Sequence, residues 1–224
     1  MKISFQLVLS KVAFLLCGYF LVALGISLGV VSNLGLSPWD VFAQGLGFTL
    51  NVNIGTAGII ISLTVMTLAM LIKVLPGIGT LFNIFFIGIF TNLIVPNLST
   101  PPNFILCLLV NILGVICLAL GSAMYLNAKT GAGPRDSLLL GVVHKTKIST
   151  KYIKPIIEGI VLVIGILLGG TFGIGTIIAL LLMGYFMDIF FKFFNYNPKE
   201  VKQLNFIEQI AFLKGELVNE NSGS

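Results

Sequence analysis

The chain has 224 residues, of which 57% are hydrophobic and 9% charged, and its mean hydropathy is +1.06. Soluble domains carry about 25% charged residues, so this composition excludes a soluble globular protein and indicates an integral membrane protein. The formal net charge of +5 does not indicate nucleic-acid binding, because the basic residues follow a membrane-topology pattern described below.

Six apolar runs follow one another along the chain, each close to the roughly 20 residues that a helix needs to cross a bilayer. The first run is longer than the apolar region of a signal peptide and has no small-x-small cleavage site before Asn33, so it is predicted to be a retained span. The six predicted membrane-spanning helices cover residues 12–31, 54–74, 78–95, 104–126, 153–168 and 174–191.

The basic residues lie on one side of this arrangement. All 13 Lys and Arg residues fall on the side that holds the N-terminus, and the loops around 32–53, 96–103 and 169–173 carry none. Basic residues concentrate in cytoplasmic loops, so this pattern predicts that both termini are cytoplasmic.

Two short segments precede the second and fifth spans. They cover residues 38–50 and 134–146, and each would reach about 20 Å as a helix, against about 30 Å of hydrocarbon. Each begins like a helix, with Ser37 or Gly133 as N-cap, a proline at the first position and an aspartate at the third. We predict two half-helices, which are either re-entrant or interfacial. Trp39 favours the interface, whereas the glycines of both segments favour close packing.

The two halves of the chain resemble each other. A shift of 96 residues, the separation of Pro38 and Pro134, places "GLSPWD" on "GAGPRD" and the "GIGT" of 77–80 on that of 173–176. Each unit holds three spans, an odd number, so the second unit would enter the membrane inverted. We therefore predict an all-α polytopic protein with six transmembrane helices in two inverted repeats, 12–95 and 104–191, within one membrane domain, 1–194.

Three equivalent positions differ in charge between the halves. Trp39, Ser62 and Asn92 of the first half correspond to Arg135, Glu158 and Asp188 of the second. Because ionisable residues in spans normally have partners, we predict that these three charges form a cluster, with Asp136 beside it. The alternative is that only Glu158 is buried and that Arg135 and Asp188 lie at the water interface.

A solute site is predicted where the two half-helices meet. Its polar lining would come from the half-helix starts and from the third and sixth spans, although Thr and Asn in membrane helices more often bond backbone or neighbouring helices than a ligand. The candidate solute-binding residues are Ser37, Pro38, Trp39, Asp40, Thr80, Asn83, Gly133, Pro134, Arg135, Asp136 and Thr176.

The chain after the last span differs from the rest. Half of the eight acidic residues lie beyond Asn195. An apolar stripe within 201–218 predicts a short amphipathic helix in a cytoplasmic tail, 195–224.

The segments "GLSPWD", "GIGTLFN", "GAGPRD" and "GGTFGIGT", together with the placement of Glu158, resemble the YczE branch of the YitT-like bacterial membrane proteins. The resemblance extends to about residue 191 and implies a small multi-pass protein of the bacterial cytoplasmic membrane. It implies little about a substrate. Where the family carries an arginine before the fifth span, this chain has Lys154.

The sequence bears on three classes of function. Inverted repeats with broken helices favour a transporter or facilitator for a small polar or anionic solute. The alternative is a non-transporting accessory or regulatory protein that positions a partner. An enzyme is not expected, because the chain has no Walker motif, nucleophile elbow or second histidine, and its three cysteines lack metal spacing. We expect no cofactor, metal or nucleic acid. The expected partners are the lipid bilayer, an unidentified small solute, and a second copy or another protein.

Overall fold

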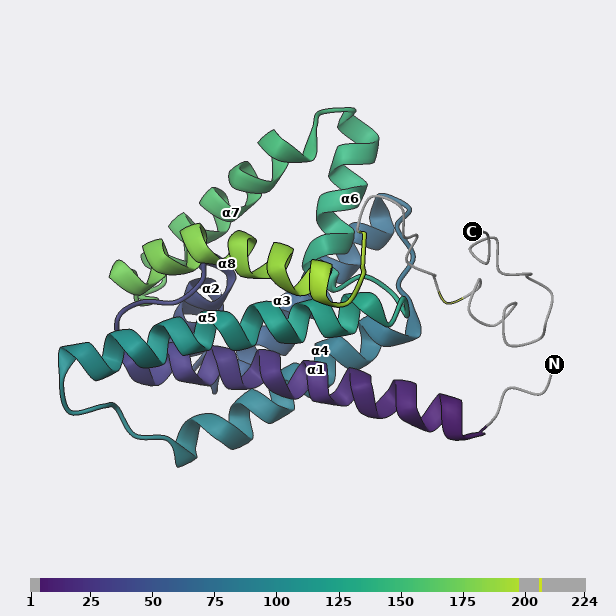
Figure 1. The fold of residues 1–224 in the computed structure, drawn as a ribbon. Coiled ribbons are helices and arrows are strands. Elements are labelled where there is room, and N and C mark those ends of the chain that lie inside the picture. The colour runs from purple at the N-terminus through teal and green to yellow at the C-terminus, as the bar shows by residue number, and fades with distance from the viewer. Residues whose placement is uncertain (1–4, 198–205, 207–224) are drawn as a thin grey trace.

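The computed structural model describes residues 5–197 and 206, and its regular elements are helices joined by short links (Figure 1). The predicted amphipathic helix of the tail lies outside the described residues, apart from Phe206. The elements are α1 Phe5–Ser32, α2 Pro38–Leu50, α3 Ile54–Leu71, α4 Ile78–Ile94, the 3-10 turn η1 Val95–Asn97, α5 Phe104–Asn127, α6 Pro134–Thr146, α7 Thr150–Leu167 and α8 Ile174–Phe193.

Five segments of the described chain are long and apolar enough to cross a membrane: Lys11–Ser32 of α1, α3, α4 with η1, α5 and α8. The predicted sixth span, α7, has 18 residues but is less apolar, because it contains Lys151, Lys154 and Glu158. The protein is thus an all-helical polytopic membrane protein.

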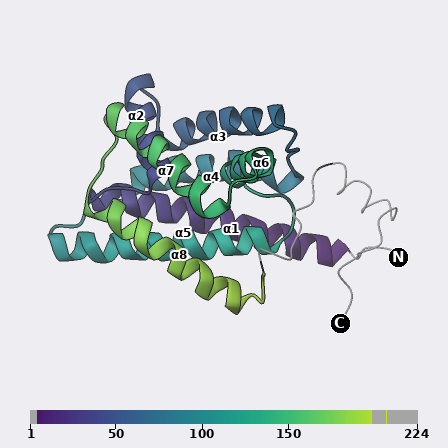
Figure 2. The same ribbon diagram turned by 90° about the horizontal axis from the view of Figure 1, so that it is seen from above.

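The helices pack in two groups (Figure 2). One group is a row in which α4 packs on α1, α1 on α5 and α5 on α8. The other is a ring in which α2 packs on α3, α3 on α6, α6 on α7 and α7 on α2. A shift of 96 residues relates α1–α4 to α5–α8. Under this shift the contact of α1 with α4 corresponds to that of α5 with α8, the contact of α2 with α3 to that of α6 with α7, and the contact of α3 with α6 to that of α7 with α2.

Glycine permits the close approach of α1 and α5, which lie antiparallel at the centre of the row (Figure 1). A Cβ atom added to Gly25 would lie 2.6 Å from the Gly114 carbonyl oxygen, and one added to Gly121 would lie 2.5 Å from the Gly18 carbonyl oxygen. The shift of 96 residues relates Gly18 to Gly114 and Gly25 to Gly121. Gly25 thus contacts Gly114, the equivalent of Gly18, and Gly18 contacts Gly121, the equivalent of Gly25.

The links into the half-helices repeat the same geometry. Gly35 and Gly131 precede α2 and α6 with φ of 107° and 122°, in the left-handed region that favours glycine. In each link a carbonyl accepts a hydrogen bond from the other half. The Gly175 amide donates to the Leu34 carbonyl at 2.7 Å, and the Gly79 amide donates to the carbonyl of Thr130, the residue equivalent to Leu34, at 2.8 Å. These bonds satisfy backbone groups that hydrocarbon could not.

One contact of the first half has no such counterpart. α3 packs along α4, where Gly55 lies against the Gly88 carbonyl and Asn92 Nδ2 donates to Thr56 Oγ1 at 2.8 Å. The equivalent helices α7 and α8 diverge (Figure 1), and a Cβ atom at Gly184, the equivalent of Gly88, would meet nothing within 4 Å. The two halves therefore differ in whether their last two helices are closed on each other.

The crowding at Gly25 leads to a stability prediction. Gly25→Ala should destabilise the protein by about 1–3 kcal/mol, because the methyl group meets backbone atoms of α5 that cannot move away alone. Gly159→Ala on α7 is the matched control, since its added Cβ would meet nothing within 4 Å and alanine favours a helix. Thermal melts in detergent measure both, and equal melting temperatures would contradict this packing.

Candidate functional site

A cavity of about 520 Å³ lies between the row and the ring, and the starts of α2 and α6 both face it. It also contacts α3, α4, α7 and α8. The predicted site residues that line it are Ser37, Pro38, Trp39, Asp40, Asn83, Gly133, Pro134, Arg135, Asp136, Glu158 and Asp188. The cavity thus brings together the two half-helix starts that the sequence singled out.

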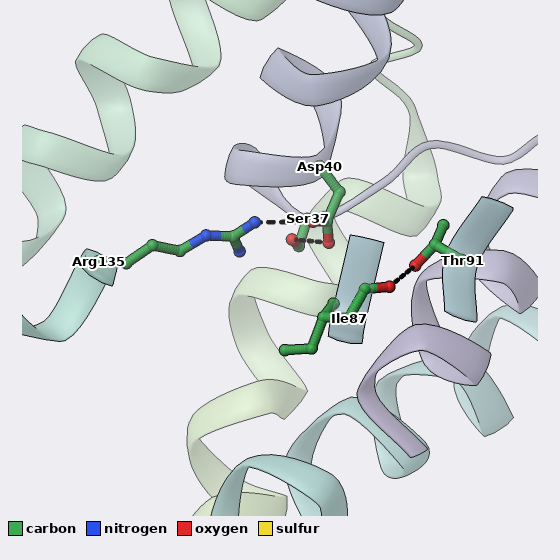
Figure 3. Close-up of polar contacts among 5 residues, drawn as sticks. All are labelled: Ser37, Asp40, Ile87, Thr91 and Arg135. Carbon is green, nitrogen blue, oxygen red and sulfur yellow. Dashed lines mark hydrogen bonds and ion pairs between the residues drawn. The ribbon is translucent and has the colours of Figure 1, made fainter. Parts of the chain in front are cut away.

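An ion pair joins the two half-helices across this cavity. Arg135 Nη2 lies 3.2 Å from Asp40 Oδ1, and Ser37 Oγ donates to Asp40 Oδ2 at 2.5 Å (Figure 3). The Asp40 side chain is only 3% exposed, whereas that of Arg135 is 36% exposed toward the cavity. A carboxylate buried to this degree requires a compensating charge, and Arg135 supplies it.

Arg135 also stacks on the equivalent residue of the other half. Its guanidinium carbon lies 5.2 Å from the centre of the Trp39 ring, in cation–π contact. Positions 39 and 135 are related by the 96-residue shift, so two equivalent positions are in direct contact.

The pairing within the predicted charge cluster differs from the expected one. Arg135 pairs with Asp40, which was predicted as a solute-binding residue but not as a member of the cluster, whereas Glu158 Oε1 lies 3.9 Å from Lys154 Nζ, one turn earlier on α7. Asp188 lines the same cavity from α8. The physical reason is burial, because the nearly inaccessible Asp40 has more to gain from the arginine than the more exposed Glu158.

Asp136, the counterpart of Asp40, has a different environment. Tyr125 at the end of α5 donates its hydroxyl to Asp136 Oδ2 at 3.4 Å. Burial raises the pKa of this carboxyl above its usual value, while the charges of Lys154 and Arg135 and the tyrosine bond act in the opposite direction. Tyr125 was not among the predicted site residues, and its equivalent, Gly29, gave no signal in the comparison of the halves.

Thr80 and Thr176 serve the helix starts and lie outside this cavity. Both are fully buried. Thr80 Oγ1 accepts from the Gly77 amide at 3.1 Å and donates to the Ala132 carbonyl at 2.7 Å, and Thr176 Oγ1 accepts from the Gly173 amide at 3.3 Å. Their contacts correspond to the backbone-bonding alternative described above.

Within the described residues, no three His, Cys, Asp or Glu side chains gather in a way that would hold a metal ion.

A double-mutant cycle tests the ion pair. Arg135→Gln should destabilise the protein, because it leaves the Asp40 carboxylate buried without a counter-charge, and adding Asp40→Asn should restore part of the loss. We expect a coupling of about 1–3 kcal/mol between the two changes in thermal or denaturant melts. Asp40→Asn combined with Glu158→Gln is the control pair, and its effects should be nearly additive. Additivity in both cycles would show that Asp40 and Arg135 do not interact.

Comparisons with known proteins agree with the membrane character. Residues 9–192 match the model of a family of unknown function, DUF6198. The chain is 33% identical to an uncharacterised membrane protein YczE of Bacillus subtilis, covering 86% of this chain and 88% of that protein. It is also 33% identical to an uncharacterised protein of Haemophilus influenzae, covering 80% of this chain and 82% of that one. No solved structure matches the chain.

Proposed function

The chain belongs to the DUF6198 family of YczE-like membrane proteins, and we propose that it is a transporter or facilitator for a small polar solute. The solute would bind in the cavity between the starts of α2 and α6. The observation that carries this proposal is the charged lining of a cavity within an apolar helical protein, since ionisable residues at membrane depth are costly and usually mark a solute or ion pathway.

The repeat supports the proposal. We interpret the chain as two inverted three-span units, with α7 as the sixth span and α2 and α6 as re-entrant half-helices. The helix contacts support this interpretation, because the 96-residue shift relates each contact of the row and the ring to a contact of the same group. In particular, it relates the contact of Gly18 with Gly121 to that of Gly25 with Gly114. Inverted repeats with broken helices that meet near the midplane are a common transporter architecture.

The difference between the halves supports alternating access. The closed pair, α3 and α4, and the open pair, α7 and α8, are equivalent elements in two arrangements. If the basic loops are cytoplasmic, the open pair lines the cavity from its cytoplasmic ends through Lys154, Glu158 and Asp188. In this proposal the structure is an inward-open state. The outward-open state forms when α7 closes on α8 and α3 leaves α4.

The charges of the lining narrow the class of solute. Asp40, Asp136, Glu158 and Asp188 outnumber the two basic residues, Arg135 and Lys154. Two of the acids are paired with those bases, so the remaining pair, Asp136 and Asp188, favours a solute that brings positive charge. A cationic or zwitterionic solute therefore fits better than the anion that the sequence had left open.

Transport by the purified protein tests the proposal. Proteoliposomes on a solid-supported membrane are exposed in turn to amines, amino acids and carboxylates, and charge movement is recorded. We expect currents for a cationic or zwitterionic compound that Asp136→Asn abolishes and that Thr67→Ala, on the lipid-facing surface of α3, leaves unchanged. If no compound evokes current or accumulates as tracer, while a protein partner co-purifies from native membranes, the accessory role replaces the transport role.

Paired cysteines test the exchange of open and closed pairs. In a background without the native Cys17, Cys107 and Cys117, the outer pair replaces Thr56 and Asn92, and the inner pair replaces the equivalent residues Tyr152 and Asp188. The outer pair should cross-link readily, because its native side chains are already hydrogen-bonded. The inner pair should cross-link more slowly, when α7 closes on α8. Each cross-link should block transport, and an inner pair that never forms would contradict alternating access.

A further inference from the structure

A second, much smaller cavity also borders Asp40. It has a volume of about 10 Å³, about the room that one water molecule needs. It is lined by residues of α1, α5, α8, the link before α2 and the first turn of α2. Its polar side chains are Ser37, Asp40 and Asn111.

Asn111 lines this cavity and has an unused side-chain oxygen. It lies in the middle of α5, is 3% exposed, and donates through Nδ2 to the Ser32 hydroxyl at 3.0 Å and to the Gly35 carbonyl at 3.1 Å. The carbonyl can only accept, so these bonds determine which end of the amide is nitrogen. The other end, Oδ1, is buried and has no hydrogen-bond partner among the described residues. An acceptor left unpaired in this way costs stability unless a ligand satisfies it.

The oxygens around the cavity are those that a hard cation prefers. A carboxylate, a hydroxyl and an amide oxygen come from Asp40, Ser37 and Asn111, and carboxylate and amide oxygens are the typical ligands of such ions in proteins. Glycine makes this close arrangement possible, because a Cβ atom at Gly175 would lie 2.5 Å from Asn111 Nδ2. In transporters, coupling ions lie beside unwound backbone next to broken helices, and the link 33–37 between α1 and α2 is such a segment.

We propose that this cavity is a binding site for one dehydrated sodium ion, held by Asp40, Ser37 and Asn111. The site exists in one half only. The residues equivalent to Ser37 and Asn111 are Gly133 and Leu15, so Asp136 lacks both neutral oxygen ligands that accompany Asp40.

The site gives the ion a route to the solute cavity. Asp40 pairs with Arg135 and also lines the small cavity, so sodium would share the carboxylate with the guanidinium and weaken the ion pair between α2 and α6. This coupling role rests on the proposed transport function, whereas ion binding itself does not. Binding and transport are therefore tested by separate measurements.

The test is the thermal stability of the purified full chain in detergent, in sodium chloride and in choline chloride at equal ionic strength. Sodium should raise the melting temperature by about 5 °C at saturation, because an ion that binds only the folded state stabilises it. Asn111→Leu and Ser37→Gly, which introduce the residues found at the equivalent positions, should each abolish the rise. Asn83→Ala is the matched control: it alters a buried asparagine of the large cavity to its equivalent, Ala179, and should keep the rise.

Two results would overturn the proposal. If the wild-type chain melts at the same temperature in both salts, the cavity holds a water molecule. If both Asn111→Leu and Ser37→Gly keep the sodium response, the ion binds elsewhere. A sodium response that depends on Asn111, in a protein that moves no solute in proteoliposomes, would retain the ion site and reject the transport function.

Discussion

The structure depends on one buried charge. Asp40 lies near the start of a half-helix with almost no access to water, and its counter-charge, Arg135, comes from the start of the other half-helix. A carboxylate in such a place is stable only with a partner, so the pair holds the two half-helices tip to tip. It also places the guanidinium on the wall of a cavity large enough for a small solute. Packing and the proposed solute site thus rest on the same contact.

Much of this arrangement could be predicted because local signals specify it. Residues 38–50 and 134–146 form the helices expected of them, since proline begins each one and the left-handed residues Asn51 and Lys147 end them. The starts of α3, α4, α5 and α8 agree with the starts of the apolar runs. α7 begins at Thr150, earlier than the expected 153, because Ser149 caps it and its first turn is polar. The length of the apolar run alone could not predict that α7 begins in this polar turn.

The partner of Arg135 could not be predicted in the same way. Comparing the halves identifies positions that changed, but it does not say which equivalent positions meet in the folded chain. Trp39 and Arg135 do meet, and the arginine therefore reaches the acid of the opposite half. Tyr125 was not predicted for another reason. Its equivalent, Gly29, has no side chain, so comparing the two positions shows a difference in size and not a change from a neutral to a charged residue.

The single arginine at this contact makes the two halves electrostatically unequal. If position 39 were also arginine, each aspartate could have its own arginine. Because position 39 is tryptophan instead, only Asp40 has an arginine partner, whereas Asp136 has the Tyr125 hydroxyl and the more distant charges of Arg135 and Lys154. The same backbone repeat therefore carries two different electrostatic environments. This electrostatic difference accompanies a structural one, since α3 is closed on α4 while α7 stands away from α8. Under the proposed transport function, a solute that brings positive charge to Asp136 would reduce the electrostatic difference and so shift the balance between the two proposed arrangements.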